Sequence, residues 1–288
     1  MISLDSIDWL HVESTTRCNA SCPSCPRNNY GYGLKDGVTV QDLPLDIFSE
    51  TIQQLKNLTT IQLCGNLGDP ISAKNINEQI DIIISYKKIK RIQIHTNGSL
   101  RSTKWWSELS DRLKCFVQAD VVFALDGLDD THSIYRQGTD YSKIIKNATA
   151  FIENGGDAVW QFIPFKHNQH QIMDCIKLSK KLGFKRFEFI RNARYPRQSK
   201  HYKTGENIQI EKWSDPKKDK NVFLRQNNTV DKKSCMHLSM PSLYLSAEGV
   251  LSPCCYLSDC DIKETNITTE LEQKNYRRKC LKNCGTKI

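Results

Sequence analysis

Short apolar runs recur along the first two thirds of the chain and alternate with longer stretches in which apolar residues return every three or four positions. The short runs are rich in β-branched and aromatic side chains and predict strands at residues 8–14, 60–63, 91–96, 120–124, 158–164 and 186–190. The longer stretches predict helices at residues 45–58, 76–87, 104–114, 142–154 and 170–182. After one long gap, the strands begin about 30 residues apart, which is the length of a strand–helix–strand unit.

This alternation is typical of a parallel sheet with helices on its faces, either open or curled into a barrel. Six units within residues 1–190 are fewer than the eight that close a complete barrel. We therefore predict an α/β fold in which residues 1–190 form a partial (β/α)6 TIM-like barrel. Residues 191–233 are polar and basic and contain Pro196, Gly205 and Pro216, so they predict a linker.

The C-terminal segment, residues 234–288, has a different character. Strand-like runs at 243–246 and 250–253 flank Ala247-Glu248-Gly249 and predict a hairpin, which is followed by a predicted helix at 270–279. A unit of this size buries little of its own surface, so it needs a cross-link or a metal centre for stability. Six of the 12 cysteines lie here: Cys235, Cys254, Cys255, Cys260, Cys280 and Cys284. We therefore predict a small cysteine-rich hairpin and helix domain built around metal.

Composition narrows the class of protein. With 288 residues, of which 25% are charged and 39% apolar, the chain matches a soluble globular protein. Its first residues carry acids where a secretory signal has a basic end, and no stretch reaches the ~18 apolar residues of a membrane span. We predict a cytoplasmic protein without a membrane partner. In that reducing compartment, the cysteines are metal ligands and buried thiols and not disulfides.

The long gap after the first predicted strand contains a cysteine trio: Cys18, Cys22 and Cys25. Pro23 and Pro26 keep this stretch out of a helix, so a loop can wrap around a compact inorganic group. Three local thiolates fit a four-iron cluster that leaves one iron for a ligand from outside the protein. They fit a zinc site equally well if a distant side chain completes the four ligands, and His11 and Cys64 are candidates. In parallel α/β folds, chemistry collects where this loop lies, beyond the carboxyl ends of the strands.

The trio, the series of strands and the cysteine-rich end together resemble the radical S-adenosylmethionine enzymes, specifically those with a C-terminal twitch or SPASM-type auxiliary cluster domain. The resemblance covers nearly the whole chain. In that family, the open iron of a 4Fe–4S cluster binds the amino and carboxylate groups of S-adenosylmethionine. An electron from the reduced cluster cleaves a carbon–sulfur bond, and the resulting 5′-deoxyadenosyl radical abstracts a hydrogen atom from the substrate.

The resemblance also implies the residues that contact S-adenosylmethionine: Gly68, Asp69, Asn97, Asp126 and Arg136. Leu67-Gly68-Asp69-Pro70 stands where the family has Gly-Gly-Glu-Pro, whose backbone and acid receive the methionine amino group. Thr96-Asn97-Gly98 resembles the segment near the ribose. Ala124-Leu125-Asp126-Gly127 resembles the family's Ser-x-Asp-Gly, with alanine in place of the hydroxyl. Arg136 is the implied partner of the methionine carboxylate, since a guanidinium binds a carboxylate through two N–H groups.

The C-terminal cysteines match the opening of the family's auxiliary domain, in which Cys235 is followed after 13 residues by Gly249 and after four more by Cys254. Together with Cys280 and Cys284, these two cysteines are the implied ligands of one auxiliary 4Fe–4S cluster. Cys260 is the first alternative ligand and Cys255 the second. Zinc remains the alternative metal. The other cysteines, Cys64, Cys115 and Cys175, lie in strand or helix patterns and are predicted to be buried thiols.

The resemblance implies a radical S-adenosylmethionine oxidoreductase of the dehydrogenase or peptide-modifying type. Its auxiliary cluster would accept the second electron, and a flavodoxin or ferredoxin would supply the first. The substrate is predicted to be a peptide or a small polar molecule. Because the chain begins directly at the first strand, with no leader-binding segment ahead of it, a small substrate or a separately delivered peptide is favoured.

An alternative function comes from charge. The net charge of +9 is concentrated in residues 191–233, which hold 12 Lys and Arg against 5 Asp and Glu. A non-catalytic, metal-stabilised module could bind nucleic acid through this segment. A nucleic-acid surface usually spreads further and contains more aromatic residues, so a solvated basic segment is favoured and nucleic acid is not the expected partner.

Overall fold

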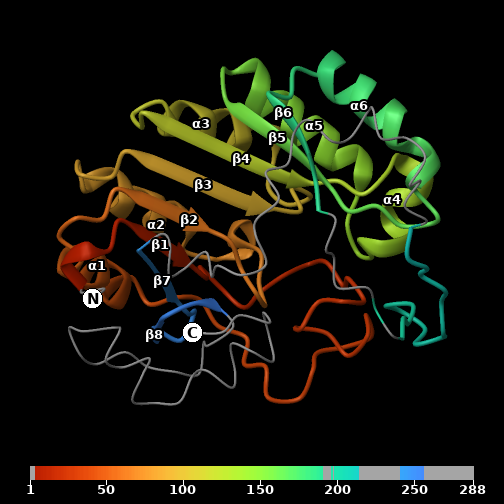
Figure 1. Cartoon of the computed structure of the whole chain (residues 1–288), viewed down its shortest axis with the longest axis horizontal. Coiled ribbons are helices and arrows are strands. Elements are labelled where there is room, and N and C mark those ends of the chain that lie inside the picture. Colours follow the sequence, from red (N-terminus) through yellow and green to blue (C-terminus); the bar gives the residue numbers. More distant parts are fainter. Residues whose placement is uncertain (1–3, 191–195, 197, 214–240, 256–288) are drawn as a thin grey trace.

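The computed structural model describes residues 4–190, 196, 198–213 and 241–255, and its central element is a sheet of eight strands (Figure 1). The strands are β1 (Trp9–Val12), β2 (Thr60–Leu63), β3 (Arg91–Thr96), β4 (Gln118–Ala124), β5 (Asp157–Phe162), β6 (Arg186–Phe189), β7 (Ser242–Leu245) and β8 (Leu251–Ser252). The helices are α1 (Leu45–Gln54), α2 (Ile76–Ser85), α3 (Thr103–Leu113), α4 (Asp129–Tyr135), α5 (Tyr141–Glu153) and α6 (Ile172–Lys181). Short 3-10 turns are η1 (Leu4–Ser6), η2 (Pro70–Ser72) and η3 (Gln169–Gln171).

The strands lie in the order β6-β5-β4-β3-β2-β1-β7-β8. All neighbouring pairs are parallel except β7 and β8, which form an antiparallel hairpin. The six predicted strands therefore follow one another across the sheet in sequence order, with helices between them (Figure 1). This arrangement confirms the predicted partial TIM-like barrel.

One face of the sheet packs against the helices. On β1 to β3, buried residues alternate with half-buried ones, and the buried set is apolar except for Thr96 at the end of β3. Strand residues such as Leu10 and Ile61 share one core with the helix residues Phe48, Trp106 and Phe151. Each fully buried large side chain contributes about 1.5–3 kcal/mol relative to its exposed state, so this layer holds the sheet in shape.

The opposite face of the sheet carries a polar row at one level of the register: Tyr244, His11, Gln62, Gln93 and Asp120. Neighbouring members interact directly: Gln62 Nε2 donates to Gln93 Oε1 at 3.1 Å, and the His11 ring packs edge-on against Tyr244. Closed TIM barrels fill this face with branched apolar side chains. The polar row therefore gives this half-barrel an interior that suits hydrogen-bonding groups.

The predicted helices are confirmed, with ends that differ by a few residues. The largest difference is at α1, which ends at Gln54 where the pattern predicted residue 58. The sequence did not predict α4, a seven-residue helix between Asp129 and Tyr135. Its sequence, DDTHSIY, is too short and polar to give a helical repeat, so its formation depends on tertiary contacts.

The predicted hairpin is confirmed as β7 and β8, with Gly249 in the turn at a φ of +83°. Its first strand pairs in parallel with β1 and so extends the barrel sheet (Figure 1). The division into residues 1–190, 191–233 and 234–288 remains a prediction. Cys235, Cys260, Cys280, Cys284 and the predicted helix at 270–279 lie outside the described residues. Within the described part of the chain, no helix has the length and apolar character of a membrane crossing.

Candidate active site

The cysteine trio lies where it was predicted, in the loop between β1 and α1 at the carboxyl ends of the strands. Hydrogen bonds within the loop shape it: Cys25 N donates to the Cys22 carbonyl at 3.0 Å, and Asn28 N donates to the Cys25 carbonyl at 3.1 Å. Cys18 and Cys25 also pack against a small apolar cluster that is separate from the main core and includes Cys22. Its buried members are Ala20, Cys22, Tyr135, Ile163, Phe165 and Ile210. The three thiols therefore lie in a largely dry environment at the mouth of the half-barrel.

Burial raises the pKa of all three thiols above its ordinary value. For Cys22 the pKa is raised to about 11. A metal must displace these protons, because the thiolate is the ligand. Donors already point at the sulfurs: Ala20 N lies 3.3 Å from Cys18 Sγ, and Arg136 Nη1 lies 3.9 Å from Cys22 Sγ. Hydrogen bonds to cluster sulfur are a recognised means of tuning iron–sulfur centres, so this donor set fits a 4Fe–4S cluster.

A single-metal site has less support. Among the described residues, no group of three His, Cys, Asp or Glu side chains is placed to hold one metal ion. One of the two candidates for a fourth zinc ligand, His11, has another partner. His11 Nε2 lies against the Cys64 carbonyl oxygen. The Cys64 thiol is partly buried, and burial raises its pKa to about 12.

The structure brings Asp126 and Arg136 together beside the trio. Arg136 follows the C-terminus of α4, and its Nε donates to Asp126 Oδ2 at 2.6 Å. The other carboxylate oxygen accepts from Ile163 N at 2.7 Å, and Asp126 is fully buried. Asp126 N donates to His132 Nδ1 at 3.2 Å, so α4 is tied to the end of β4. One edge of the guanidinium is thus fixed by Asp126, and Nη1 is turned toward Cys22.

The Asp69 side chain was predicted to receive the methionine amino group, but in the structure it binds other groups of the protein. Its buried carboxylate accepts from Ile71 N at 3.0 Å, Thr96 Oγ1 at 2.8 Å and Asn97 N at 2.6 Å. These bonds cap η2 and join the loop after β2 to the end of β3. Both oxygens are engaged within the protein, so the side chain joins the two loops at the strand ends.

Gly68 and Asn97 lie at the same strand ends. A Cβ atom at Gly68 would lie 1.8 Å from the Thr15 carbonyl oxygen, so only glycine allows this loop to approach the cysteine loop so closely. Asn97 Nδ2 donates to Asn19 Oδ1 at 2.9 Å and lies 3.8 Å from Cys18 Sγ. The predicted S-adenosylmethionine residues therefore converge on the cysteine loop.

Sequence reasoning missed Glu13, which directly follows β1. This glutamate is 2% exposed and accepts from Leu67 N, Gly68 N and the Tyr244 hydroxyl. Burial raises the pKa of its carboxyl group. The signal in the sequence was an acid at the end of an apolar strand, which was included in the predicted strand without a role. A buried acid at the carboxyl end of a strand is typical of a functional site.

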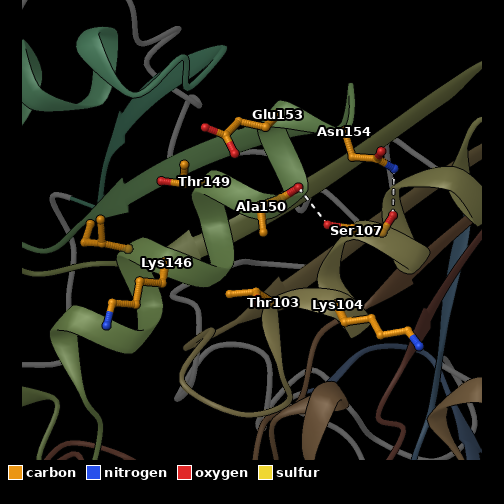
Figure 2. Close-up of a pocket in the computed structure, with 9 residues that line it drawn as sticks. Thr103, Lys104, Ser107, Lys146, Thr149, Ala150, Glu153 and Asn154 are labelled. Carbon is orange, nitrogen blue, oxygen red and sulfur yellow. Dashed lines mark hydrogen bonds between the residues drawn. The ribbon is translucent and has the colours of Figure 1, made fainter.

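A cavity of about 240 Å³ lies beside the cysteine loop, and Glu13, Pro26, Asn66 and Tyr244 are among its lining residues. A larger cavity of about 660 Å³ lies elsewhere, between α3 and α5 (Figure 2). Lys104 and Glu153 are among its lining residues, and none of the lining residues is a cysteine or follows a strand. The smaller cavity adjoins the cysteine loop through Thr16 and Pro26, so it is the one next to the candidate site.

The remaining cysteines give a mixed outcome. Cys175 is buried, as predicted. The prediction for Cys115 was wrong: this cysteine is exposed because α3 ends at Leu113 and the next residues form the turn before β4. Cys254, beyond β8, is buried, and Cys255 is partly buried.

A sequence model of the radical SAM superfamily matches residues 12–178, which is more than half of the chain. The chain therefore belongs to the radical SAM superfamily. This membership implies a 4Fe–4S cluster and S-adenosylmethionine as cofactors, in agreement with the donor set around the trio. No curated protein sequence matches the chain.

Solved structures resemble the chain at low sequence identity. Streptococcus suis SuiB bound to S-adenosylmethionine aligns with a TM-score of 0.63 at 16% identity, over 97% of this chain and 71% of SuiB. SuiB bound to precursor peptide SuiA gives 0.59 at 17% identity, over 91% of this chain and 62% of that chain. Native anSMEcpe with bound AdoMet gives 0.52 at 21% identity, over 63% of this chain and 51% of that chain. These alignments support the partial-barrel fold.

Proposed function

We propose that this chain is a radical S-adenosylmethionine oxidoreductase that abstracts a hydrogen atom from a peptide or a small polar substrate. The observation that carries the proposal is the cysteine trio with Arg136 beside its buried member, Cys22, and with that arginine anchored by Asp126. When bound, the cluster and S-adenosylmethionine supply the one-electron cleavage that generates the radical. The protein's own residues bind, orient and shield these groups.

Four groups would position S-adenosylmethionine. The second edge of the Arg136 guanidinium would bind the methionine carboxylate, because Nε is already committed to Asp126. The backbone around Gly68 would receive the methionine amino group. Asn97 lies between the trio and the end of β3, where the family pattern has its ribose segment. Asp126 acts through Arg136 and fixes its orientation.

We propose that a second 4Fe–4S cluster is held by Cys235, Cys254, Cys280 and Cys284, with Cys260 as the first alternative ligand. Cys254 supports this proposal because it is buried at the end of the hairpin that extends the barrel sheet. That cluster would accept an electron from the substrate radical and complete a two-electron oxidation. A flavodoxin or ferredoxin would deliver the first electron.

A polar substrate is supported by the interior of the half-barrel. The polar row crosses five strands where closed barrels have apolar side chains. A peptide backbone or a hydroxyl-rich small molecule would find donors and acceptors there. The structural likeness to SuiB bound to precursor peptide SuiA supports a peptide as the first class to test.

Anaerobic reconstitution tests the proposed function. The loaded protein is expected to bind about eight irons and, with dithionite, to convert S-adenosylmethionine to 5′-deoxyadenosine. A Cys22→Ala variant is expected to lose this conversion, since the cluster loses a ligand. A fully loaded wild-type protein that releases no 5′-deoxyadenosine would contradict the proposal.

The auxiliary cluster has its own test. Cys254→Ala is expected to lower the iron content from about eight to about four per chain, while dithionite-driven release of 5′-deoxyadenosine continues. The matched control is Cys115→Ala, which removes an exposed thiol and is expected to leave about eight irons. An unchanged iron content in Cys254→Ala would remove this cysteine from the ligand set.

A further inference from the structure

Glu13 lies at a junction of three segments that are far apart in the sequence. Strand β1 lies between β2 and β7, and its last residue, Val12, is paired with Leu63 on one side and Leu245 on the other. The residue after β1 can therefore reach the loop after β2 and the hairpin strand β7. Glu13 contacts both.

The Glu13 carboxylate binds each neighbour through a separate oxygen. Oε1 accepts from the backbone N–H groups of Leu67 and Gly68, and Oε2 accepts from the Tyr244 hydroxyl. These are charge-assisted bonds in a buried place, where such bonds are strong. Removing the carboxylate would leave two half-buried backbone donors without this acceptor, which is unfavourable for the observed loop position.

The same loop is held on a second side. Asn66 Nδ2 donates to the Cys255 carbonyl at 2.9 Å, and the Cys25 thiol lies 3.9 Å from the Asn66 carbonyl. The loop after β2 therefore contacts the cysteine loop, β1 and the hairpin region together. A small movement of this loop would change the position of Gly68 relative to the trio.

We propose that Glu13 is a positioning residue that holds the Leu67–Gly68 backbone ready for S-adenosylmethionine, with Tyr244 of β7 as its fixed support. A role as a proton acceptor fits the geometry less well, because Glu13 is 2% exposed and both oxygens already accept hydrogen bonds. The inference rests on the proposed function, since it assigns Leu67 and Gly68 to the S-adenosylmethionine site. It adds a requirement: the hairpin of β7 and β8 must pair with β1 before the Leu67–Gly68 backbone is positioned for S-adenosylmethionine.

The test uses the full-length reconstituted protein and three variants. Glu13→Ala removes the acceptor, Glu13→Gln keeps one carbonyl oxygen for the two N–H groups, and Tyr244→Phe removes the supporting hydroxyl. Two quantities are measured: amide hydrogen exchange at Leu67 and Gly68 without S-adenosylmethionine, and the equilibrium Kd for S-adenosylmethionine. The control is Glu50→Gln, which changes an exposed acid on α1 that lines neither cavity.

Glu13→Ala is expected to exchange at least tenfold faster at both amides and to bind S-adenosylmethionine at least tenfold more weakly, with cluster iron retained. Glu13→Gln is expected to recover most of the affinity, and Tyr244→Phe to weaken it several-fold. Glu50→Gln is expected to match the wild type. A structural role alone would lower the folded fraction without this graded change in Kd.

Wild-type affinity in Glu13→Ala with iron retained would overturn the inference. If Glu13→Ala does not fold, Tyr244→Phe decides: unchanged exchange and unchanged Kd would overturn it. A wild-type protein that does not bind S-adenosylmethionine would contradict the proposed function. In that case the exchange data still decide whether Glu13 orders the loop.

Discussion

Three buried carboxylates organise the candidate site, and each accepts at least one hydrogen bond from the backbone. Asp69 joins the loop after β2 to β3, Asp126 orients Arg136, and Glu13 holds the Leu67–Gly68 backbone. Burial raises the pKa of all three carboxyl groups. Their hydrogen bonds oppose this shift, because N–H and O–H donors stabilise the charged form. The buried acids therefore position backbone segments and the Arg136 side chain.

Arg136→Lys tests the predicted carboxylate contact. Lysine is a single point charge and cannot hold Asp126 while presenting a second edge to a ligand. We expect the Kd for S-adenosylmethionine to rise at least tenfold, with cluster iron close to the wild-type content. Arg112→Lys serves as the control, because Arg112 pairs with the exposed Asp81 on α2. Equal Kd values in the two variants would remove Arg136 from the binding site.

Gly68→Ala tests the close approach of the two loops. The added Cβ would lie 1.8 Å from the Thr15 carbonyl oxygen, so the backbone must shift, and we expect the free energy of unfolding to fall by about 3 kcal/mol. The control is Gly33→Ala, where nothing lies within 4 Å and only a φ of +70° opposes the change. That control should cost about 1 kcal/mol. Urea denaturation measures both, and equal losses would contradict the packing argument.

At the scale of elements, the sequence predicted the strands and helices that carry a local, periodic pattern of apolar residues. The strands and the longer helices follow from apolar repeats, which depend on neighbouring residues alone. Helix α4 was missed because its seven residues carry no repeat and depend on contacts such as that between His132 Nδ1 and Asp126 N. The exposure of Cys115 was missed because it depends on where α3 ends.

His132 makes the anchoring of α4 sensitive to pH. Its Nδ1 accepts a hydrogen bond from Asp126 N, and its Nε2 bonds Thr139 Oγ1, so the folded protein holds a neutral ring. Burial lowers the pKa of His132 to about 3, well below the ~6.5 of an unfolded chain. The unfolded state therefore binds the extra proton first as the pH falls. Stability should be lost between about pH 6.5 and pH 3, by up to about 1.4 kcal/mol per pH unit from this group.

The measurement is the free energy of unfolding in urea at several values between pH 7.5 and pH 4.5. His132→Asn keeps an acceptor for Asp126 N without a titrating ring, so its stability should fall less steeply with pH than that of the wild type. His170→Asn changes an exposed histidine and is the control. Parallel curves for the wild type and His132→Asn would contradict the assignment.

At the scale of the whole molecule, the site divides into a part that the sequence predicted and a part that it did not. The trio and the motifs after β2, β3 and β4 were predictable because parallel strands bring their carboxyl ends to one edge. The contact between Glu13 and Tyr244 joins residues 231 positions apart, and no local pattern specifies such a pair. The parallel pairing of β7 with β1 was missed for the same reason.

The pairing of β1 with β7 also affects how the chain folds while it is being synthesised. Val12 finds its partner Leu245 only after 233 further residues have been synthesised. At about 5–20 residues per second, the first strand waits on the order of 12–47 s with one edge unpaired. An unpaired edge is a template for association with other chains. Ribosome-associated chaperones are therefore expected to engage this nascent chain early and to release it once the hairpin has emerged.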